Sequence, residues 1–378
     1  MQISIILGLG FGDEGKGSFV NYLCSKSKDS LVVRFNGGHQ VGHTVVVGDK
    51  RHVFSNFGSG TLQGVPTYWS EYCTVDPIGL LNEGTALRNM GISPNIIFNA
   101  NAMVTTPFDT IKNINLDNGN NHGTVGVGFG TTIQRNEDHY RLFVRDLEYP
   151  AIRDAKLKLI QSHYGYISPD NSSTAKMIEK FKAACDDLAE NYSIVNQLIF
   201  DRFNNLIFEG GQGIMLDMDY GFFPHVTRSN TTSKNAIEII KSLGIEPNYK
   251  NITTYYITRA YQTRHGNGPM SNEHLDTSYI KVNPLETNVN TGYQGVFRKS
   301  VLDMDMLDYA IHCDNFHNPY SKKAIVITCL DQVPENIPVT IGGELTTKTF
   351  REIGRFCDIN FKYPCYSDTG YQYTIENF

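Results

Sequence analysis

The sequence lacks the features that would place a protein outside an ordinary cell interior. It has no C-x-x-C pair, its seven cysteines are odd in number and far apart, and no secretory signal pattern precedes them. No apolar run approaches the roughly 20 residues that a membrane-spanning helix requires. We therefore expect a soluble, cytoplasmic protein with reduced thiols and no membrane partner.

The chain is also poor in positive charge and in segment boundaries. Its 33 lysines and arginines are outnumbered by 39 acidic residues, and the net charge of −6 argues against a general nucleic-acid binder. Internal repeats, low-complexity tracts and linkers are absent from the sequence. We expect a single large domain over residues 1–378.

Short apolar runs alternate with helical patterns, which favours an α/β fold. The expected architecture is a P-loop-like, mostly parallel central sheet covered by helices, with inserted helical segments. Strands are expected at residues 3–7, 30–35, 95–99, 206–209, 252–258 and 323–329. Helices are expected at residues 18–23, 174–191 and 233–243, and structured turns at 120–132 and 264–269.

The most informative segment is a phosphate loop with one part missing. Residues 10–16 fit G-x-x-x-x-G-K between an apolar strand and a helix, where backbone N–H groups and Lys16 would surround phosphate oxygens. The next residue should be Ser or Thr to hold magnesium, but it is Gly17. The loop instead carries Asp13 and Glu14, and a carboxylate in an anion cradle needs a metal ion or a proton-transfer role to compensate it. The alternative is a plain glycine-rich turn.

A second group of polar residues follows the strand predicted at 30–35. Residues 36–44 contain three glycines and the histidines His39 and His43, and loops at the carboxyl ends of parallel strands gather around ligands. His43 could act as a general acid. The alternatives are a structural histidine and a metal site made by both rings, which a glycine-rich loop would hold poorly.

A third group begins where the strand at 206–209 runs into glycines. Residues 208–213 read F-E-G-G-Q-G, and residues 216–227 continue with a polar and aromatic segment. Gln212 offers both a donor and an acceptor, which suits an oxo or amide edge on a ring.

These motifs together resemble the adenylosuccinate synthetase family. Its members carry G-D-E-G-K-G, G-G-H-N-A-G-H-T, F-E-G-x-Q-G, P-x-V-T-S-S-N-T-T and K-A-Y-S-T-R-V-G-A-G-P. The matching segments of this chain are residues 12–17, 37–44, 208–213, 224–232 and 259–269, the last reading R-A-Y-Q-T-R-H-G-N-G-P. The order is the same from residue 8 to about residue 331, so chance similarity is excluded.

The resemblance implies a two-step ligation. A nucleoside triphosphate phosphorylates the 6-oxygen of a purine nucleotide, and the amino group of L-aspartate then displaces the phosphate. It assigns Asp13 as the base that removes the N1 proton and as a contact to Mg²⁺, His43 as the group that stabilises negative charge, and Lys16 as the holder of the transferring phosphoryl group. The Gly42 carbonyl would be a second metal contact and would partly replace the missing Ser or Thr.

The resemblance also assigns the binding residues. Nucleotide contacts fall on Gly12, Glu14, Gly15, Gly17, Thr44, Asp331, Thr369 and Gly370. Contacts to the acceptor purine nucleotide fall on Gln40, Thr124, Val125, Arg141, Gln212 and Thr227, and contacts to aspartate on Thr291, Gly292 and Arg298. Arg141 matches an arginine that the family lends across its dimer interface, so a homodimer is expected.

Three segments depart from the family pattern. The acceptor-phosphate loop G-T-T-G-R-G-I-G-P is G-T-V-G-V-G-F-G-T at residues 123–131, without one hydroxyl and one cation. The aspartate segment keeps only Arg298 and Lys299 as cations; Arg298 is either the guanidinium fork for aspartate or a surface-exposed arginine. In T-K-L-D, Cys329 replaces the lysine, which leaves GTP, ATP and dATP open as donors.

The acceptor and the class of protein also stay open at this level. The chain is similar in length to archaeal and viral members, and one viral branch accepts dGMP in place of IMP; a viral chain would act in the host cytoplasm. Both IMP and (d)GMP therefore remain. Two other classes compete: a P-loop NTPase switch, against which Gly17 counts, and a nucleotide-binding module without ligase activity, against which Asp13 and His43 count.

Overall fold

The computed structural model describes most of the chain. The described residues are 1–27, 29–120, 126–165, 172–197, 202–244, 249–283, 286, 295–356, 365–367 and 373–375. Six residues singled out from the sequence lie outside them, namely Thr124, Val125, Thr291, Gly292, Thr369 and Gly370.

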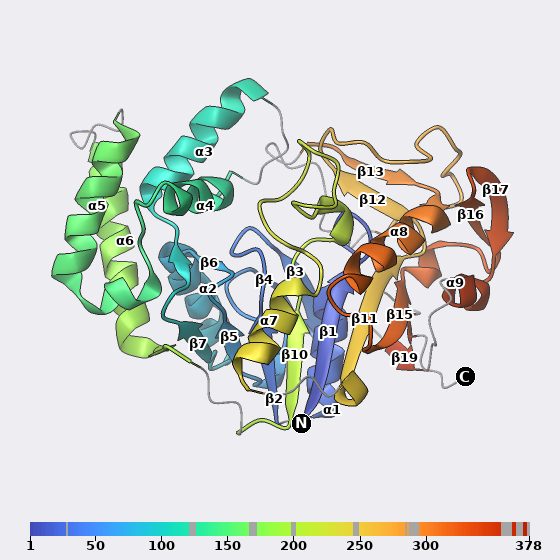
Figure 1. Ribbon diagram of the computed structural model, residues 1–378, viewed down its shortest axis with the longest axis horizontal. Helices are drawn as coiled ribbons and strands as arrows, with labels where there is room; N and C mark the ends of the chain where they lie inside the picture. The colour runs from blue at the N-terminus through green and yellow to red at the C-terminus, as the bar shows by residue number, and fades with distance from the viewer. Residues whose placement is uncertain are drawn as a thin grey trace.

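A ten-stranded sheet forms the centre of the described structure (Figure 1). Its order is β19 (Tyr373–Ile375), β18 (Cys365–Ser367), β15 (Lys322–Thr328), β11 (Ile252–Arg259), β1 (Gln2–Gly8), β10 (Asn205–Glu209), β2 (Ser30–Arg34), β5 (Thr67–Trp69), β7 (Ile96–Asn99) and β9 (Ser193–Val195). All neighbouring pairs are parallel except β18 and β19. The predicted α/β class with a mostly parallel sheet is therefore confirmed.

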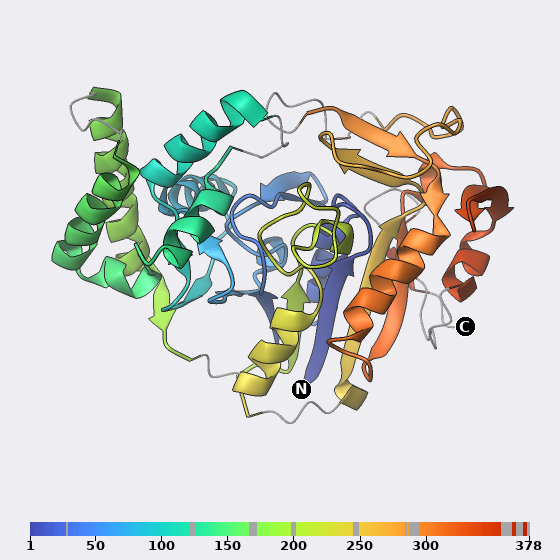
Figure 2. The ribbon, with the colours of Figure 1, turned by 45° about the horizontal axis from the view of Figure 1, so that its top comes forward.

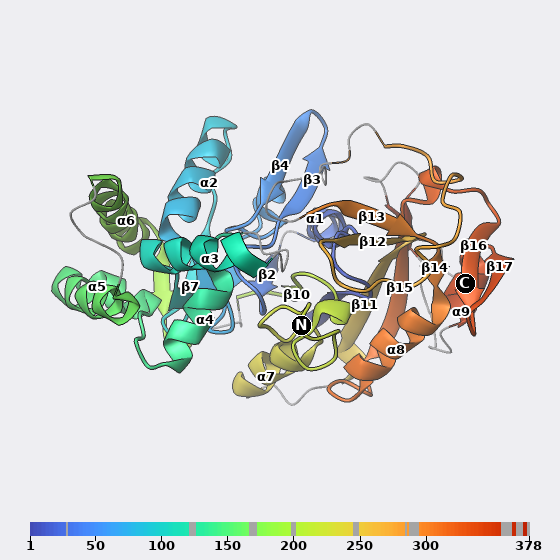
Figure 3. The ribbon, with the colours of Figure 1, turned by 90° about the horizontal axis from the view of Figure 1, so that it is seen from above.

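The central strands form because their apolar runs can be buried on both faces, as parallel sheets require. In β1, Ile5 and Leu7 pack on one side with α7 (Lys234–Ser242) and α8 (Met304–Asn315). Ile6 points to the other side and packs with Phe19 of α1 (Lys16–Lys26). Figures 2 and 3 show this arrangement, with α7 and α8 across the sheet from α1.

The remaining elements form two groups beside the sheet (Figure 3). On one side are the helices α2 (Pro77–Asn89), α3 (Pro107–Asn120), α4 (Phe129–Glu137), α5 (Pro150–Tyr164) and α6 (Ser172–Asn191). On the other are β12 (Gln262–His265), β13 (Phe297–Ser300), β14 (Leu302–Asp303), β16 (Ile337–Ile341), β17 (Glu344–Lys348) and α9 (Phe350–Phe356). Short ladders are made by β3 (His43–Val47) with β4 (Lys50–Phe54), and by β6 (Thr74–Val75) with β8 (Met103–Val104).

The predicted strands and long helices are confirmed, most of them to within two residues. The helix predicted at 174–191 is α6, and its apolar side chains Phe181, Cys185 and Leu188 are buried. The turn predicted at 120–132 was wrong at both ends, because α3 reaches residue 120 and α4 begins at Phe129. Gly128 has a φ of 86° and caps α4, so this glycine starts a helix instead of extending a turn.

The register brings the carboxyl ends of five central strands to one edge. Gly8 pairs with Ile257, Ile6 with Glu209, and Arg259 with Thr328. The loops that follow β1, β2, β10, β11 and β15 therefore meet above this edge, which is where ligands bind in open α/β sheets. None of the helices in the described ranges combines the length and apolar character needed to cross a bilayer.

Candidate active site

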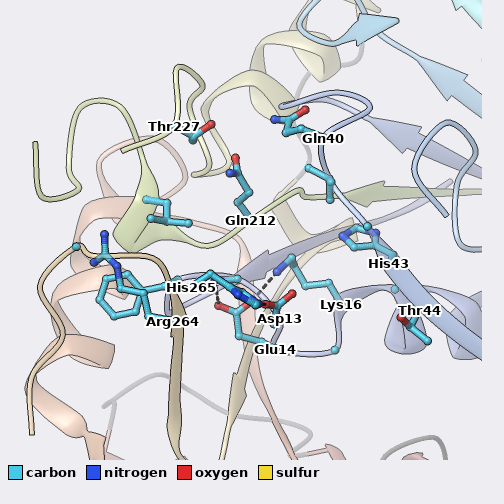
Figure 4. A pocket seen from close by; sticks show the side chains of 18 of the residues that line it. Asp13, Glu14, Lys16, Gln40, His43, Thr44, Gln212, Thr227, Arg264 and His265 are labelled. Carbon is cyan, nitrogen blue, oxygen red and sulfur yellow. Dashed lines mark hydrogen bonds and ion pairs between the residues drawn. The ribbon is translucent and has the colours of Figure 1, made fainter. Parts of the chain in front are cut away.

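A cavity of about 410 Å³ lies where these loops meet (Figure 4). Most of the site residues predicted from the sequence line it: Gly12, Asp13, Glu14, Gly15, Lys16, Gly17, Gln40, Gly42, His43, Thr44, Gln212 and Thr227. They come from segments up to about 200 residues apart in the chain, so the fold gathers three separate motifs around one space.

The phosphate loop is shaped by left-handed backbone. Gly12 has a φ of 97°, Asp13 of 61° and Gly15, the residue before α1, of 96°. A Cβ at Gly17 would lie 2.5 Å from His43 Cβ and 2.7 Å from Ser59 Oγ. The Ser or Thr expected after Lys16 is therefore excluded because β3 packs directly against the start of α1.

Glu14 supplies an anion inside its own loop. Its carboxylate accepts hydrogen bonds from the N–H groups of Gly10 at 3.1 Å and Gly12 at 2.9 Å, and from Lys16 Nζ at 2.5 Å. The side chain is only 4% exposed. The Glu14 carbonyl accepts a hydrogen bond from Thr328 Oγ1 at the end of β15, at 2.8 Å. These contacts hold the loop open in a fixed shape and keep Lys16 at the cavity wall.

Asp13 faces the cavity beside a histidine that the sequence did not single out. Its Oδ2 lies 3.2 Å from His265 Nε2, and its carbonyl accepts a hydrogen bond from Arg259 Nε at 2.6 Å. Burial alone would raise the pKa of the Asp13 carboxyl, but His265, Arg259 and Lys16 lower it below its ordinary value. Asp13 is therefore an ionised carboxylate at neutral pH. The sequence did contain a sign that His265 is unusual, because the family motif has valine at the position where this chain has histidine.

His43 is oriented by a buried carboxylate, Glu209, at the end of β10. Its Nδ1 lies 2.7 Å from Glu209 Oε1, and Glu209 also accepts hydrogen bonds from the N–H and hydroxyl of Ser59. Burial alone would raise the pKa of Glu209, but His43, Arg34 and Ser59 lower it to about 2. Burial lowers the pKa of His43 while Glu209 opposes this. His43 Nε2 is left without a hydrogen-bond partner among the described residues, and His43 lines the cavity.

His39 does not join His43 in a metal site. Its Nδ1 lies 3.2 Å from Thr74 Oγ1 and its Nε2 lies 3.0 Å from the Val127 carbonyl oxygen. Both ring nitrogens are therefore occupied in holding the residue 36–44 segment against its neighbours, which is a structural role.

Two side-chain amides and a hydroxyl line the opposite wall of the cavity. Gln40, Gln212 and Thr227 lie across from Asp13 and Lys16 in Figure 4. In the described part of the chain, both side-chain polar atoms of Gln40 and the Oε1 of Gln212 are buried without a hydrogen-bond partner. Buried amides are normally paired, so these atoms are suited to the polar edge of a ligand.

The described residues contain no cluster of three or more His, Cys, Asp or Glu side chains that could hold a metal ion. Asp13 and Gly42 nevertheless both line the cavity, and they can offer a carboxylate and a backbone carbonyl. Two hard oxygen donors beside a phosphate loop fit Mg²⁺, which takes few protein ligands and completes its shell with phosphate oxygens and water.

A pair of arginines extends the site toward β12 and β13. Arg264 lines the cavity and pairs in register with Arg298. Within the described ranges the Nε atoms of both are buried without a hydrogen-bond partner. Burial and the neighbouring Arg298 lower the pKa of Arg264 to about 10. Arg298 lies on β13, donates to Glu273 at 2.6 Å and has a side chain that is 22% exposed; its contact with aspartate stays a prediction. The sequence analysis missed Arg264.

Besides Arg298, two predicted residues of the described ranges lie outside the cavity lining. Arg141 is exposed after α4, and its Nε donates to the Asn136 carbonyl at 3.2 Å. The predicted role of Arg141 is in the site of a partner chain, and the structure of one chain does not test it. That role therefore stays a prediction. Asp331 is exposed in a short 3₁₀ helix after β15, although Thr328, Cys329 and Gln332 around it do line the cavity. Its contact with the donor base also stays a prediction.

Comparisons with known proteins agree with this geometry. The family model described as adenylosuccinate synthetase matches residues 5–363. The chain is 33% identical over 345 residues to the adenylosuccinate synthetase of Buchnera aphidicola subsp. Schizaphis graminum, covering 86% of this chain and 76% of that protein. It is 29% identical over 379 residues to the adenylosuccinate synthetase of Picrophilus torridus, covering 98% of this chain and 88% of that protein.

Two solved structures share the fold. The fully ligated adenylosuccinate synthetase from Plasmodium falciparum superposes with a TM-score of 0.75 at 20% identity, over the whole of both chains. The succinoaminodeoxyadenylate synthetase of cyanophage S-2L, bound to dGMP and dATP as an energy donor, superposes with a TM-score of 0.64 at 16% identity, covering 99% of this chain and 95% of that one. With the family match over nearly the full length and the motif residues gathered in one cavity, the chain belongs to the adenylosuccinate synthetase family and is a nucleotide-dependent C–N ligase.

Proposed function

We propose that the enzyme joins L-aspartate to C6 of a 6-oxopurine nucleoside monophosphate, IMP or (d)GMP, through a 6-phosphoryl intermediate made from a nucleoside triphosphate. The observation that carries this proposal is the position of Asp13. An ionised carboxylate faces the same cavity as the phosphate-loop lysine and His43, opposite the unpaired amides of Gln40 and Gln212.

In the first step the purine oxygen must become a nucleophile. A 6-oxo group attacks phosphorus poorly until N1 loses its proton, and the Asp13 carboxylate is the base at hand. Lys16 lies at the cavity wall and balances the charge of the transferring phosphoryl group. Mg²⁺ held by Asp13 and the Gly42 carbonyl would neutralise charge on the nucleotide phosphates.

In the second step the amino group of aspartate attacks C6. The new C–N bond forms as the C6–O bond breaks, and inorganic phosphate leaves with the bonding electrons. His43 presents Nε2 to this region while Glu209 holds Nδ1. An anionic phosphoryl group beside Nε2 favours the protonated imidazole, and the ring then donates a hydrogen bond to the leaving oxygen.

Aspartate carries two carboxylates, which need cations with free donors. The paired guanidinium groups of Arg264 and Arg298 are next to one another, and each retains an unpaired Nε among the described residues. A carboxylate between them would relieve their mutual repulsion. We assign the aspartate side chain to this pair.

The acceptor phosphate meets a different set of groups. Val127 stands where the family has arginine, and Phe129 and Gly130 open α4 at the cavity wall. Helix N-termini attract phosphate through their free N–H groups. Arg228 lines the same wall, and it replaces a serine of the family motif P-x-V-T-S-S-N-T-T. It supplies the cation that the loop has lost.

A substrate matrix tests the proposed function. IMP, GMP and dGMP are each combined with ATP, dATP and GTP and with Mg²⁺, with and without L-aspartate, and both phosphate release and the succinyl product are measured. The ligase releases phosphate only when aspartate and one purine monophosphate are present. Hydrolysis that needs neither would indicate a P-loop NTPase switch, and no turnover in any combination would indicate a nucleotide-binding module.

The donor and the acceptor are read from the same matrix. The S-2L synthetase is described with dGMP and dATP, and the relatives above are named for adenylosuccinate. Because IMP and (d)GMP differ by the 2-amino group, the ratio of their kcat/KM values measures how the site treats that group.

A further inference from the structure

His265 stands at the place where the cavity wall meets the phosphate loop. Its Nε2 is 3.2 Å from Asp13 Oδ2, and its side chain is 16% exposed and lines the cavity. Figure 4 shows the imidazole directly beside the Asp13 side chain. Within the described residues, it is the one basic side chain within ion-pair distance of that carboxylate.

The position of the imidazole is fixed by regular structure. His265 is the last residue of β12 and pairs in register with Phe297 of β13. The two rings pack with their centroids 5.0 Å apart at an angle of 42°. A strand ladder and an aromatic neighbour restrict the imidazole more than a loop would. The imidazole can therefore hold a neighbouring side chain that is free to rotate.

The Asp13 carboxylate is the neighbouring group whose orientation is not fixed by its own backbone. Its backbone is held in the left-handed region, with a φ of 61°, and by the hydrogen bond from Arg259 Nε to its carbonyl. These contacts fix the Cα but leave rotation about the side-chain bonds. His265 Nε2 lies 3.2 Å from Oδ2, but among the described residues both ring nitrogens are without a partner in hydrogen-bond geometry. Rotation of the carboxylate about its side-chain bonds would bring Oδ2 into line with the Nε2–H donor and leave Oδ1 for another partner.

We propose that His265 is a positioning residue that holds Asp13 Oδ2 and turns Oδ1 toward N1 of the bound purine. The role rests on the proposed function of Asp13 as the base. The family motif has valine at this place, and an aliphatic side chain cannot donate a hydrogen bond. This chain therefore carries a support for its base that the family pattern lacks. Misplacing a reacting group by about 1 Å can lower a rate on the order of 10²-fold.

Two substitutions test the role. His265→Val introduces the family residue and removes the donor, whereas His265→Gln keeps an N–H donor at similar reach. We expect His265→Val to lower kcat about 10- to 100-fold, with KM values for the purine nucleotide and the triphosphate within about twofold. His265→Gln should recover most of that loss. His274→Val, at an exposed histidine nine residues further along the chain, is the matched control and should keep the wild-type rate.

Other readouts separate positioning from folding and from direct binding. Calorimetric affinity for the triphosphate should be unchanged in His265→Val, and a crystal structure of this variant should show the Asp13 carboxylate rotated. A higher KM for the purine nucleotide at unchanged kcat would make His265 a substrate contact and overturn the role. An equal loss in the Gln and Val variants would also overturn it, because the donor would then be irrelevant.

The wild-type chain distinguishes this inference from the proposed function. If the wild type ligates and His265→Val ligates equally fast, only the role of His265 is overturned. If the wild type fails to ligate in every combination of the matrix, the base role of Asp13 fails and the role of His265 fails with it. Thermal unfolding of each variant, with His265→Leu as a second aliphatic replacement, shows that a lost rate is not a lost fold.

Discussion

Gly17 shows how one missing side chain can define this site. The residue after a phosphate-loop lysine is usually a hydroxyl residue that holds magnesium, and here the packing of β3 on α1 forbids one. The backbone at Gly17 is in direct contact with His43 and Ser59. His43 occupies the space that a serine or threonine side chain would need, so we expect the metal contacts to come from Asp13 and the Gly42 carbonyl.

Restoring the hydroxyl residue should therefore damage the protein. In Gly17→Ser the new Cβ would lie 2.5 Å from His43 Cβ, and relieving this overlap should cost roughly 1–3 kcal/mol of unfolding free energy. Urea unfolding measures the loss. Gly354→Ser is the control, since its Cβ would meet its nearest heavy atom, Ile325 Cγ2, at 3.7 Å. Unchanged stability in Gly17→Ser would contradict the packing argument.

Glu209 should make stability depend on pH. Its folded pKa of about 2 is lower than its ordinary value of 4.5, so its contribution is fully present above pH 4.5 and is lost as the pH falls toward 2. The shift corresponds to about 3 kcal/mol. Glu209→Gln should be less stable than the wild type at pH 7, and the difference should shrink on acidification to pH 3. A difference that stays constant with pH, measured by denaturant unfolding, would exclude this charge effect.

At the scale of elements, local pattern predicted the strands well and the helix starts less well. The strands β1 and β10 are apolar runs that lead directly into glycine-rich segments, a pattern that is visible in the sequence alone. The start of α4 was missed because Gly128, with a φ of 86°, has the same composition signal in a helix cap as in a turn. Composition alone cannot distinguish the two.

The start of α4 is also the element that we expect to bind the acceptor phosphate. Arg228 lies against this helix, since a Cβ at Gly130 would be 3.7 Å from Arg228 Cδ, and its guanidinium now pairs with Gln134 and Glu137. Arg228→Ser should raise KM for the purine monophosphate about tenfold, or about 1.4 kcal/mol, with little change in kcat. Arg228→Lys should lose less.

Initial-rate kinetics at several salt concentrations check this assignment. The KM of the wild type should rise with salt more steeply than that of Arg228→Ser, because a charge contact is screened. An unchanged KM in Arg228→Ser would leave the helix N-terminus as the phosphate site and remove Arg228 from it.

At the scale of the whole molecule, the sequence identified motifs but not their neighbours. Asp13, Lys16, His43 and Gln212 lie in contiguous motifs, so their spacing alone made them visible. Arg264 and His265 also lie in a contiguous motif, residues 259–269, but their neighbours Arg298 and Asp13 lie elsewhere in the sequence. Such contacts depend on the order of strands in the sheet, which a single sequence does not encode in any local pattern.

The last prediction concerns two copies of the chain. In a symmetric homodimer, each site would combine Asp13 of one chain with Arg141 of the other. Asp13→Ala should abolish ligation while leaving triphosphate affinity within about tenfold, or about 1.4 kcal/mol. Arg141→Ala should also be nearly inactive, because this arginine would complete the site of the partner chain. Arg141 is exposed and lies outside the cavity lining of its own chain, as such a role requires. In a mixed dimer of the two variants, one site loses both residues and the other keeps both.

Coexpression of the two variants with different tags tests this arrangement. Random pairing makes half of the dimers mixed, and each mixed dimer has one intact site, so roughly a quarter of the wild-type activity should return. Purification through both tags should raise this to about half, because every dimer is then mixed. A chain that is monomeric by light scattering, or an Arg141→Ala variant with full activity, would show that each site is complete within one chain.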